Sequence, residues 1–310
     1  MLRFNLLFKS FAVFVLFIFL VFDMQKNDEV YDNSKKSIFI KDSINVIWVS
    51  KNIKVRDYFN YIDSLVNQHN LKANYVMTEH ILVRANHWII DTLANTDYYR
   101  MIKKDSFVYN QKEMIVLPKG CNILIPDSTV TSSILNSMNK TRIAINIPEF
   151  KLRIFQDSLL LYEFPVRVGR NEKKYLKMGN RITDLKTIAG NGKIVNHNRN
   201  PDYYNPVNGH QYYVTRRDDY KVTKLPQIPF IETEINGIRN GQLIHPTTNP
   251  NTLNKPYSNG CIGTSEADAW IIYYYAPIST KIDITYNLNR TNEKGETTIL
   301  QDIYALKVKQ

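Results

Sequence analysis

The sequence contains little cysteine and no recognisable metal-binding pattern. Its two cysteines, Cys121 and Cys261, leave room for one disulfide bond at most. Metal-ligand spacing is absent around five of the six histidines, His69, His80, His87, His197 and His210. We therefore expect neither a metal ion nor another cofactor.

Acidic residues are also scarce relative to basic ones. The chain has 29 Asp and Glu against 40 Lys and Arg, a formal net charge of +11, which attracts polyanions such as nucleic acid, anionic lipid or an acidic wall polymer. The basic residues are spread along the chain, with no arginine-rich arm and no RNA-binding aromatic pattern, so nucleic acid is not an expected partner. Hydrophobic residues at 44% and charged residues at 22% indicate a globular protein.

A continuous apolar stretch stands at the N-terminus. Arg3 and Lys9 precede the 12-residue run Phe11 to Phe22, and the chain turns polar at Asp23. A basic flank before such a run is typical of an export signal, and no cleavage site follows it. We predict a signal anchor over 1–24, with a cleaved signal peptide as the alternative. The rest of the chain would then be inner-membrane anchored and face the periplasm, or be secreted into it.

The region before Thr141 mixes helical and strand patterns. Residues 25–41 are polar and charged and are interpreted as a tether. Apolar residues recur at helical spacing in 55–70 and again in 87–102, and a short apolar strand closes the region. These patterns predict an α+β accessory domain over 42–135.

Strand patterns dominate from Thr141 onward. Ile143, Ile145 and Ile147 alternate on one face, and a polar turn at 156–158 separates two further strands, which predicts antiparallel hairpins. The 20 Tyr and 14 Phe also suit half-buried strands better than a helical bundle. We expect a mainly β domain over 141–288.

The remaining segments are assigned by composition. Residues 186–214 are rich in Gly, Asn and Pro and are expected to form long irregular loops. Strands are expected at 241–246 and 281–288. A C-terminal tail over 289–310 is expected to hold a polar linker and a last strand at 299–308.

The stretch "IHPTTNPNTLNKPYSNGCIGTSEADAW" places a cysteine after a Ser-Asn-Gly turn. A thiol attacks a carbonyl carbon only as a thiolate, so a nucleophilic cysteine needs a stabilised anion, a base and oxyanion donors. Ser265 is a predicted helix N-cap, which would put Cys261 beside a helix N-terminus that favours the thiolate. Gly260 allows the sharp turn, and His245 at a strand end is the candidate base. From chemistry alone, a buried inert cysteine and an ordinary polar histidine remain open.

These residues resemble the motif of the YkuD-type L,D-transpeptidase family, a His followed by Ser-X-Gly-Cys-aliphatic. His245 and Cys261 stand sixteen positions apart (261 − 245), and Ser258, Gly260 and Ile262 also match. The resemblance implies an exported cysteine enzyme with a mixed β-sandwich-like fold. Such enzymes take an acyl group from a peptidoglycan stem peptide and pass it to an amine or to water. Cys261 would be the nucleophile, His245 the base, and the backbone N–H groups of Gly260 and Cys261 the oxyanion donors.

Three positions depart from the family pattern. Asn259 stands where a second His is usual, Gly263 where an Arg or Asn is common, and Pro246 where a Gly or Ser follows the base. Substrate contacts are expected from the residues around the nucleophile, namely Tyr257, Ser258, Asn259, Gly263 and Thr264. The departures leave three functions open: transfer between stem peptides, hydrolysis by the same cysteine, and an inactive wall-binding module.

The expected partners follow from these assignments. Peptidoglycan stem peptides would occupy the site, and the N-terminal segment would contact the membrane. A disulfide between Cys121 and Cys261 would remove the nucleophile, so we predict that Cys121 is unpaired and structural.

Overall fold

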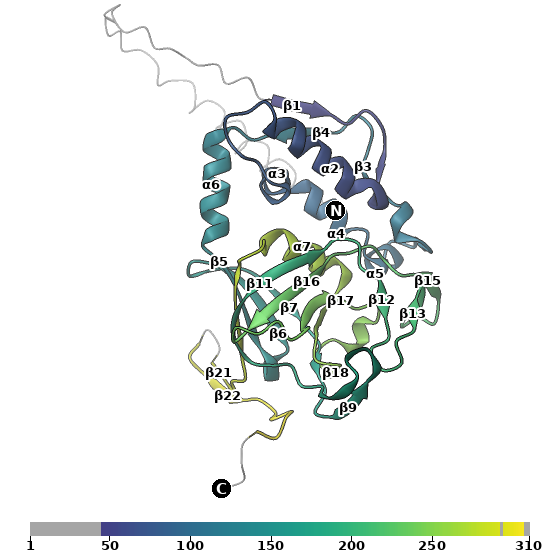
Figure 1. Cartoon of the computed structure of the whole chain (residues 1–310), viewed down its shortest axis with the longest axis vertical. Helices are drawn as coiled ribbons and strands as arrows, with labels where there is room; N and C mark the ends of the chain where they lie inside the picture. Colours follow the sequence, from purple (N-terminus) through teal and green to yellow (C-terminus); the bar gives the residue numbers. More distant parts are fainter. Residues whose placement is uncertain (1–44, 292–293, 307–310) are drawn as a thin grey trace, which may run out of the picture. The chain divides into compact units, whose positions relative to one another are not determined.

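The computed structural model describes residues 45–291 and 294–306 (Figure 1). The predicted signal anchor over 1–24 and the tether over 25–41 lie outside the described residues. Within those residues, no helix has the length and hydrophobicity needed to cross a bilayer.

The largest element is a mixed eight-stranded sheet. Two neighbouring pairs in it are parallel, β17 with β19 and β5 with β20, and the others are antiparallel. This sheet confirms the mainly β class. In spatial order the strands are β19 (Ile262–Thr264), β17 (Leu243–Pro246), β16 (Phe230–Ile235), β11 (Gly190–Asn198), β20 (Lys281–Thr285), β5 (Thr141–Asn146), β6 (Lys151–Gln156) and β7 (Leu159–Pro165).

The predicted hairpins are confirmed in β5, β6 and β7. Ile143 pairs with Ile154 across the first hairpin, and both side chains are fully buried. Asp157 has a positive φ of 53° in the turn between β6 and β7, a conformation that Asp tolerates better than most residues. The period-two alternation of apolar residues therefore marks the buried face of the sheet.

The prediction of irregular loops over 186–214 is wrong for nine residues of that segment. They form β11, which lies between β16 and β20 inside the sheet. Only Ile194 in this strand is buried. Gly192 has no room for a side chain, because a Cβ there would lie 1.8 Å from the Glu234 carbonyl oxygen. A strand without alternating apolar residues gives no periodic pattern to detect. The rest of the segment contributes to the small ribbons.

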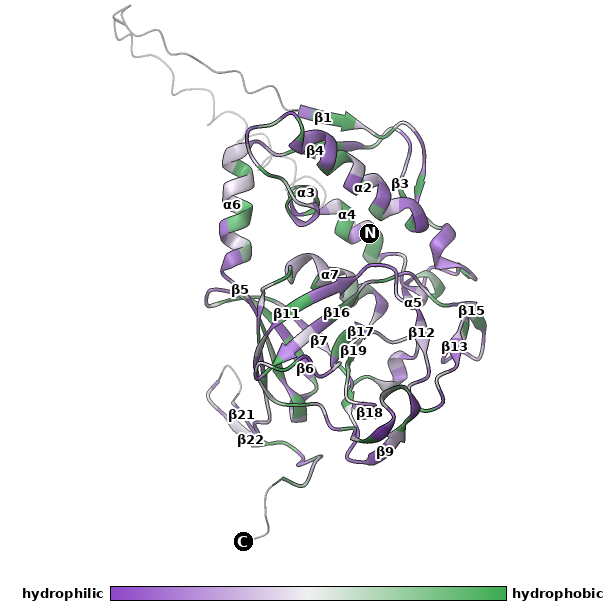
Figure 2. Ribbon diagram, viewed as in Figure 1, coloured by the Kyte–Doolittle hydropathy of each residue, from purple (hydrophilic) through white to green (hydrophobic). Residues whose placement is uncertain are grey.

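Among residues 45–140, five α-helices precede the sheet in the chain. The helix predicted over 55–70 is confirmed as α2 (Val55–Asn70), whose buried residues include Tyr58 and Ile62, and Figure 2 shows mostly hydrophilic residues on its visible face. The helix predicted over 87–102 is split in two, because the Asp97 carboxylate caps a new helix there by accepting from Tyr99 and Arg100 N–H groups. The other helices of this group are α3 (Glu79–Ala85), α4 (Trp88–Ala94), α5 (Tyr98–Ile102) and α6 (Ser128–Asn139).

The last helix, α7 (Glu266–Tyr275), follows β19 and packs against α3 and α4. Its residues are nearly all buried, and Trp270 is completely so. The Tyr274 hydroxyl contacts the Tyr58 hydroxyl of α2 at 2.7 Å, and it also donates to Glu79 at 2.8 Å. The segment before Thr141 and the sheet region are therefore joined through the buried face of α7.

Two-stranded ribbons complete the described strands. They are β1 (Asn45–Trp48) with β4 (Asn122–Ile125), β2 (Ile53–Lys54) with β3 (Ile115–Leu117), β8 (Val168–Gly169) with β18 (Pro256–Ser258), β9 (Lys173–Leu176) with β10 (Arg181–Asp184), β12 (Tyr203–Tyr204) with β13 (Gln211–Tyr212), β14 (Val214–Arg216) with β15 (Val222–Lys224), and β21 (Asn289–Thr291) with β22 (Thr297–Ile299). The 3-10 helices are η1 (Gln111–Glu113), η2 (Ile147–Glu149), η3 (Lys177–Gly179) and η4 (Pro250–Thr252).

The predicted last strand over 299–308 is wrong for its described residues 300–306. The strand β22 ends at Ile299, and the chain then turns instead of extending. The Asp302 carboxylate accepts from the Tyr286 hydroxyl at 2.6 Å and from the Leu306 N–H at 3.1 Å, which closes a turn. Tyr304 is buried in this turn, with 4% of its surface exposed, and its ring stacks on Tyr286.

Candidate active site

The motif residues meet at one edge of the large sheet. The strands β17 and β19 are parallel neighbours, and their register pairs Ile244 with Ile262 and His245 with Gly263. The two isoleucines are buried in the core. Since side chains alternate between faces, His245 and Gly263 share the opposite face, as does Cys261, which directly precedes β19. The register therefore brings the predicted base and the predicted nucleophile to one face of two adjacent strands.

His245 is held as a neutral imidazole. Its Nδ1 lies 2.9 Å from the Pro246 carbonyl oxygen, which only accepts, so Nδ1 carries the proton and Nε2 keeps a lone pair. The ring also packs against Phe230, with centroids 5.0 Å apart. Burial and the nearby Arg167 cation lower the pKa of His245 to about 4. The imidazole is therefore unprotonated at neutral pH and able to take a proton.

Cys261 is a free, partly buried thiol. Its Sγ lies 4.0 Å from the Gly241 carbonyl oxygen, and within the described residues no hydrogen bond joins it to His245. Burial raises the pKa of the thiol, while the Leu243 backbone and the Arg167 charge act in the opposite direction. The resting site therefore holds a neutral imidazole and a thiol whose ionisation depends on its neighbours.

The predicted effect of a helix dipole on Cys261 is wrong. Ser265 does cap α7, since its Oγ accepts from the Asp268 N–H at 3.0 Å. The three residues of β19 separate Cys261 from that cap, roughly 10 Å of extended chain, and the dipole acts only near the first turn. The helix N-terminus also binds the Asp97 carboxylate, which accepts from the Ala267 N–H at 3.0 Å. The thiolate needs another source of stabilisation.

The turn before the nucleophile is fixed by its own residues. The Ser258 hydroxyl donates to the Cys261 carbonyl at 2.5 Å, and the Gly260 N–H donates to the same hydroxyl oxygen at 3.3 Å. Gly260 has a φ of 109°, which favours glycine. Its carbonyl accepts from the Thr187 hydroxyl at 2.9 Å. Ser258 is thus buried inside the turn, where its hydroxyl holds the backbone that carries the thiol.

The other predicted substrate residues differ in exposure. Tyr257 is 57% exposed, whereas Gly263 and Thr264 are buried. The Asn259 amide oxygen accepts from Arg170 Nη2 at 2.6 Å, so this side chain is bound to a neighbouring cation. Among the predicted contacts, Tyr257 is the side chain that the fold leaves most accessible.

Sequence reasoning missed a tyrosine that supports the turn from behind. The Tyr304 hydroxyl donates to the Gly169 carbonyl at 2.8 Å and accepts from the Thr187 N–H at 3.0 Å. Thr187 in turn holds Gly260. A tyrosine in a segment of unclear pattern gives no sign of such a role, because the contact joins distant parts of the chain.

The other cysteine lies away from this site. Cys121 is also free, packs against the hydrophobic core, and has a pKa raised by burial. The prediction that it is unpaired is confirmed. In the described part of the chain, no three His, Cys, Asp or Glu side chains are grouped so as to hold a metal ion.

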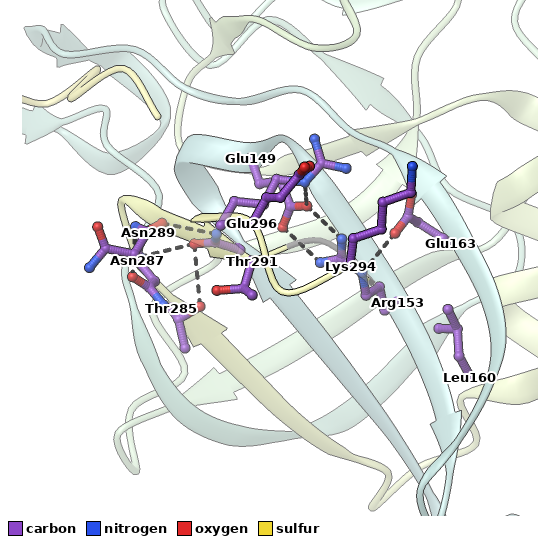
Figure 3. A pocket seen from close by; sticks show the side chains of 12 residues that line it. Glu149, Arg153, Leu160, Glu163, Thr285, Asn287, Asn289, Thr291, Lys294 and Glu296 are labelled. Carbon is purple, nitrogen blue, oxygen red and sulfur yellow. Dashed lines mark hydrogen bonds and ion pairs between the residues drawn. The ribbon is translucent and has the colours of Figure 1, made fainter. Parts of the chain in front are cut away.

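A cavity of about 770 Å³ lies elsewhere in the sheet region. Figure 3 shows Arg153 between Glu149 and Glu163, with Lys294 nearby. Neither Cys261 nor His245 lines this cavity, so it is separate from the candidate active site.

Comparison with known families decides the assignment of this region. Residues 140–284 match the family model of the YkuD L,D-transpeptidase catalytic domain. These residues form a YkuD domain. Its borders enclose the sheet edge that carries Cys261 and His245, and they nearly coincide with the region where the strand patterns dominate. Comparison with curated proteins gives no match.

Several solved structures resemble the chain weakly. An L,D-transpeptidase from Mycobacterium smegmatis is 14% identical, over 47% of this chain and 58% of that one, with a TM-score of 0.34. L,D-transpeptidase 3 from Mycobacterium tuberculosis is 16% identical, over 47% and 61%, with a TM-score of 0.31. The L,D-transpeptidase from Xylanimonas cellulosilytica is 13% identical, over 77% and 97%, with a TM-score of 0.35. The chain thus spans little more than half of the first two, and the likeness to the YkuD family lies in the match of residues 140–284.

Proposed function

We propose that this protein is a peptidoglycan L,D-transpeptidase that works through an acyl-enzyme on Cys261. The observation that carries the proposal is the register of β17 and β19, which puts His245 and Cys261 on one face at the edge of a YkuD domain. The neutral His245 fits a general base, since its Nε2 is unprotonated at neutral pH.

The chemistry divides between these two side chains. His245 Nε2 takes the Cys261 proton as Sγ attacks the carbonyl carbon of the bond between the L and D residues of the stem peptide. The carbon–nitrogen bond breaks, the leaving amine takes the proton from His245, and a thioester remains. An amine of a second stem then attacks the thioester and releases the thiol. The Cys261 N–H is the oxyanion donor we favour, because the Gly260 N–H already donates to Ser258.

The test is incubation of the full-length protein with muropeptides of tetrapeptide stems, followed by mass spectrometry. Dimers that disappear in the Cys261→Ala variant support transfer through this thiol. Trimmed monomers that disappear in the same variant would replace transfer by hydrolysis. Dimers that persist in Cys261→Ala, or no product from the unsubstituted chain, would contradict the proposal.

We also propose that the protein is exported and anchored through residues 1–24. This rests on the sequence alone, on the basic flank and the apolar run from Phe11 to Phe22. Protease added to intact cells should spare the Cys261 region until the outer compartment is opened. Protection that is lost only after the inner membrane is lysed would contradict the proposed topology.

A further inference from the structure

Arg167 reaches the active-site face from a segment that the motif does not include. It lies between β7 and β8 and pairs with β19 through its backbone: the Arg167 N–H donates to the Gly263 carbonyl at 2.8 Å, and the Gly263 N–H donates back at 3.0 Å. This bridge adds the segment to the free edge of β19. The residue thus has a fixed place opposite Gly263, two positions after the nucleophile.

The side chain of Arg167 crosses the space above Gly263. A Cβ on Gly263 would lie 2.5 Å from Arg167 Nε, 2.7 Å from Cγ and 3.0 Å from Cδ, all too close for a real contact. That missing Cβ would point to the face of the sheet that Gly263 shares with Cys261 and His245. The guanidinium is therefore laid across the active-site face, and glycine at position 263 is what leaves room for it.

The guanidinium has few partners for its charge. Its Nη1 donates to the Thr252 hydroxyl at 3.2 Å, while its Nε is buried with no hydrogen-bond partner in the described protein. No described carboxylate forms an ion pair with it, although Arg153 and Arg217 each have one. Taking a cation out of water without an opposite charge is unfavourable. A buried guanidinium without an ion-pair partner would be stabilised by an anion that forms at the site.

The nearby titratable groups identify that anion. Cys261 and Tyr257 interact with the Arg167 charge and oppose the lowering of its pKa by burial. The same charge lowers the pKa of the Cys261 thiol and of His245. Tyr257 is mostly exposed and takes no part in the proposed reaction. Of the groups facing Arg167, only the thiol becomes an anion during the proposed reaction.

We propose that Arg167 is the cation that stabilises the thiolate of Cys261, supplied across Gly263 from the segment between β7 and β8. This inference rests on the proposed function, because it takes Cys261 as the nucleophile. Arg167 is a positioning residue, because it acts through the sulfur of Cys261. It supplies the stabilisation of the thiolate that the distant N-terminus of α7 does not supply.

The test measures the thiol without any substrate. Iodoacetamide alkylates only the thiolate, so the alkylation rate of Cys261 between pH 5 and 10, followed by peptide mass spectrometry of the full-length protein, gives the apparent pKa of the thiol. In Arg167→Met we expect that pKa to rise by about one unit or more and the rate at pH 7 to fall about tenfold. Arg167→Lys should keep most of the wild-type profile because it keeps the charge.

Two controls distinguish the loss of the Arg167 charge from damage to the fold. Arg142→Met removes an exposed arginine on β5, which four other strands separate from β19 in the sheet, and should leave the Cys261 profile unchanged. Cys121 in the same molecule reports unfolding, since its alkylation should stay slow in every folded variant. If Arg167→Met exposes Cys121, the Gly263→Ala variant tests the inference instead. Its new Cβ displaces the guanidinium while the arginine itself is kept. We expect the Cys261 profile to shift in the same direction as in Arg167→Met.

Two results would overturn the inference. They are a folded Arg167→Met variant whose Cys261 profile matches that of wild type, and, if Arg167→Met is unfolded, a wild-type profile in Gly263→Ala. Either result leaves the proposed transpeptidase activity standing. Muropeptide dimers made by Cys261→Ala would instead remove the proposed function, whatever Arg167 does to the thiol.

Discussion

Three half-buried histidines, His80, His197 and His245, lie at two places in the molecule that differ in their neighbours. At the sheet edge, His245 stands beside Cys261 and the Arg167 cation. Between the helices and the sheet, His80 and His197 stack on each other with centroids 5.4 Å apart. Each of the three rings has one nitrogen close to a backbone carbonyl, at 2.9 to 3.1 Å. The hydrogen bonding of the rings therefore does not distinguish the two places.

The pKa values do not distinguish them either. Burial lowers the pKa of His80 to about 3, of His197 to about 4 and of His245 to about 4. A perturbed pKa here measures removal from water, which both places share. The difference is that His245 shares a strand face with a thiol, whereas His80 and His197 pack against the tyrosines of α7. A buried histidine becomes a candidate base through what lies beside it.

The largest expected effect is on the rate of acylation, which should separate His245 from His197. Cys261→Ala should abolish acylation, and His245→Ala should slow it by at least about 10²-fold, the usual scale for a lost general base. The measurement is the mass shift of the protein with a tetrapeptide or a carbapenem-like acyl donor. His197→Ala is the matched control, since it removes an equally buried ring outside the site and should acylate at nearly the wild-type rate. An unaffected rate in His245→Ala would place the chemistry elsewhere.

The next effect concerns stability, where the three histidines should behave alike. Each folded pKa lies below the value near 6.5 of an unfolded histidine, so the unfolded chain binds more protons as the pH falls. The stabilisation is complete above about pH 6.5 and is lost as the pH falls toward 4. Between pH 7 and 5.5 each ring should reduce the free energy of unfolding by about 1 kcal/mol.

Urea unfolding at the two pH values checks this prediction. Substituting Gln for His80, His197 or His245, one at a time, should flatten the pH dependence by a similar amount in each case. Only the last of these variants should also lose acylation. A pH dependence that is unchanged in all three variants would show that burial does not hold these rings neutral.

A smaller effect is expected behind the site. Tyr304→Phe leaves the Gly169 carbonyl and the Thr187 N–H without their hydroxyl partner, which should cost about 1–3 kcal/mol of stability. Acylation should slow a few-fold, because Thr187 no longer holds the Gly260 turn firmly. Tyr75→Phe is the control: it removes a hydroxyl that donates to the Pro126 carbonyl at 2.6 Å in the helical region. Equal acylation rates in the two variants would contradict the link from Tyr304 to the turn.

The smallest effect is expected at the position that departs from the family pattern. Asn259→Ala should slow acylation only a few-fold, because its amide oxygen is bound to Arg170 and carries no proton for the reaction. Asn259→His should stay active if the imidazole accepts from the same guanidinium. A loss in Asn259→Ala as large as that in His245→Ala would mean that the amide contacts the reacting groups. Acylation rates under identical conditions decide between these outcomes.

The sequence predicts the parts of this fold that repeat along the chain. Alternation in 141–147 marks β5, and the spacing between His245 and Cys261 locates two strands that prove to be neighbours. Local sequence patterns do not predict the structure at positions where the residue type is determined by a contact with a distant part of the chain. In β11, position 192 has no room for a side chain because the Glu234 carbonyl lies against it, and the proposed role of Arg167 depends on the glycine opposite it at position 263. Which strand pairs with the edge of β19 is a tertiary fact that no local pattern contains.

The tyrosine behind the turn also affects the order of events during folding. The bonds from Tyr304 join residues 117 and 135 positions apart, and such contacts form only after long loops have closed. The backbone that presents Cys261 is therefore completed late, when the chain near residue 304 docks. If Cys261 is the nucleophile, as we propose, we expect its reactivity to appear only after this contact has formed.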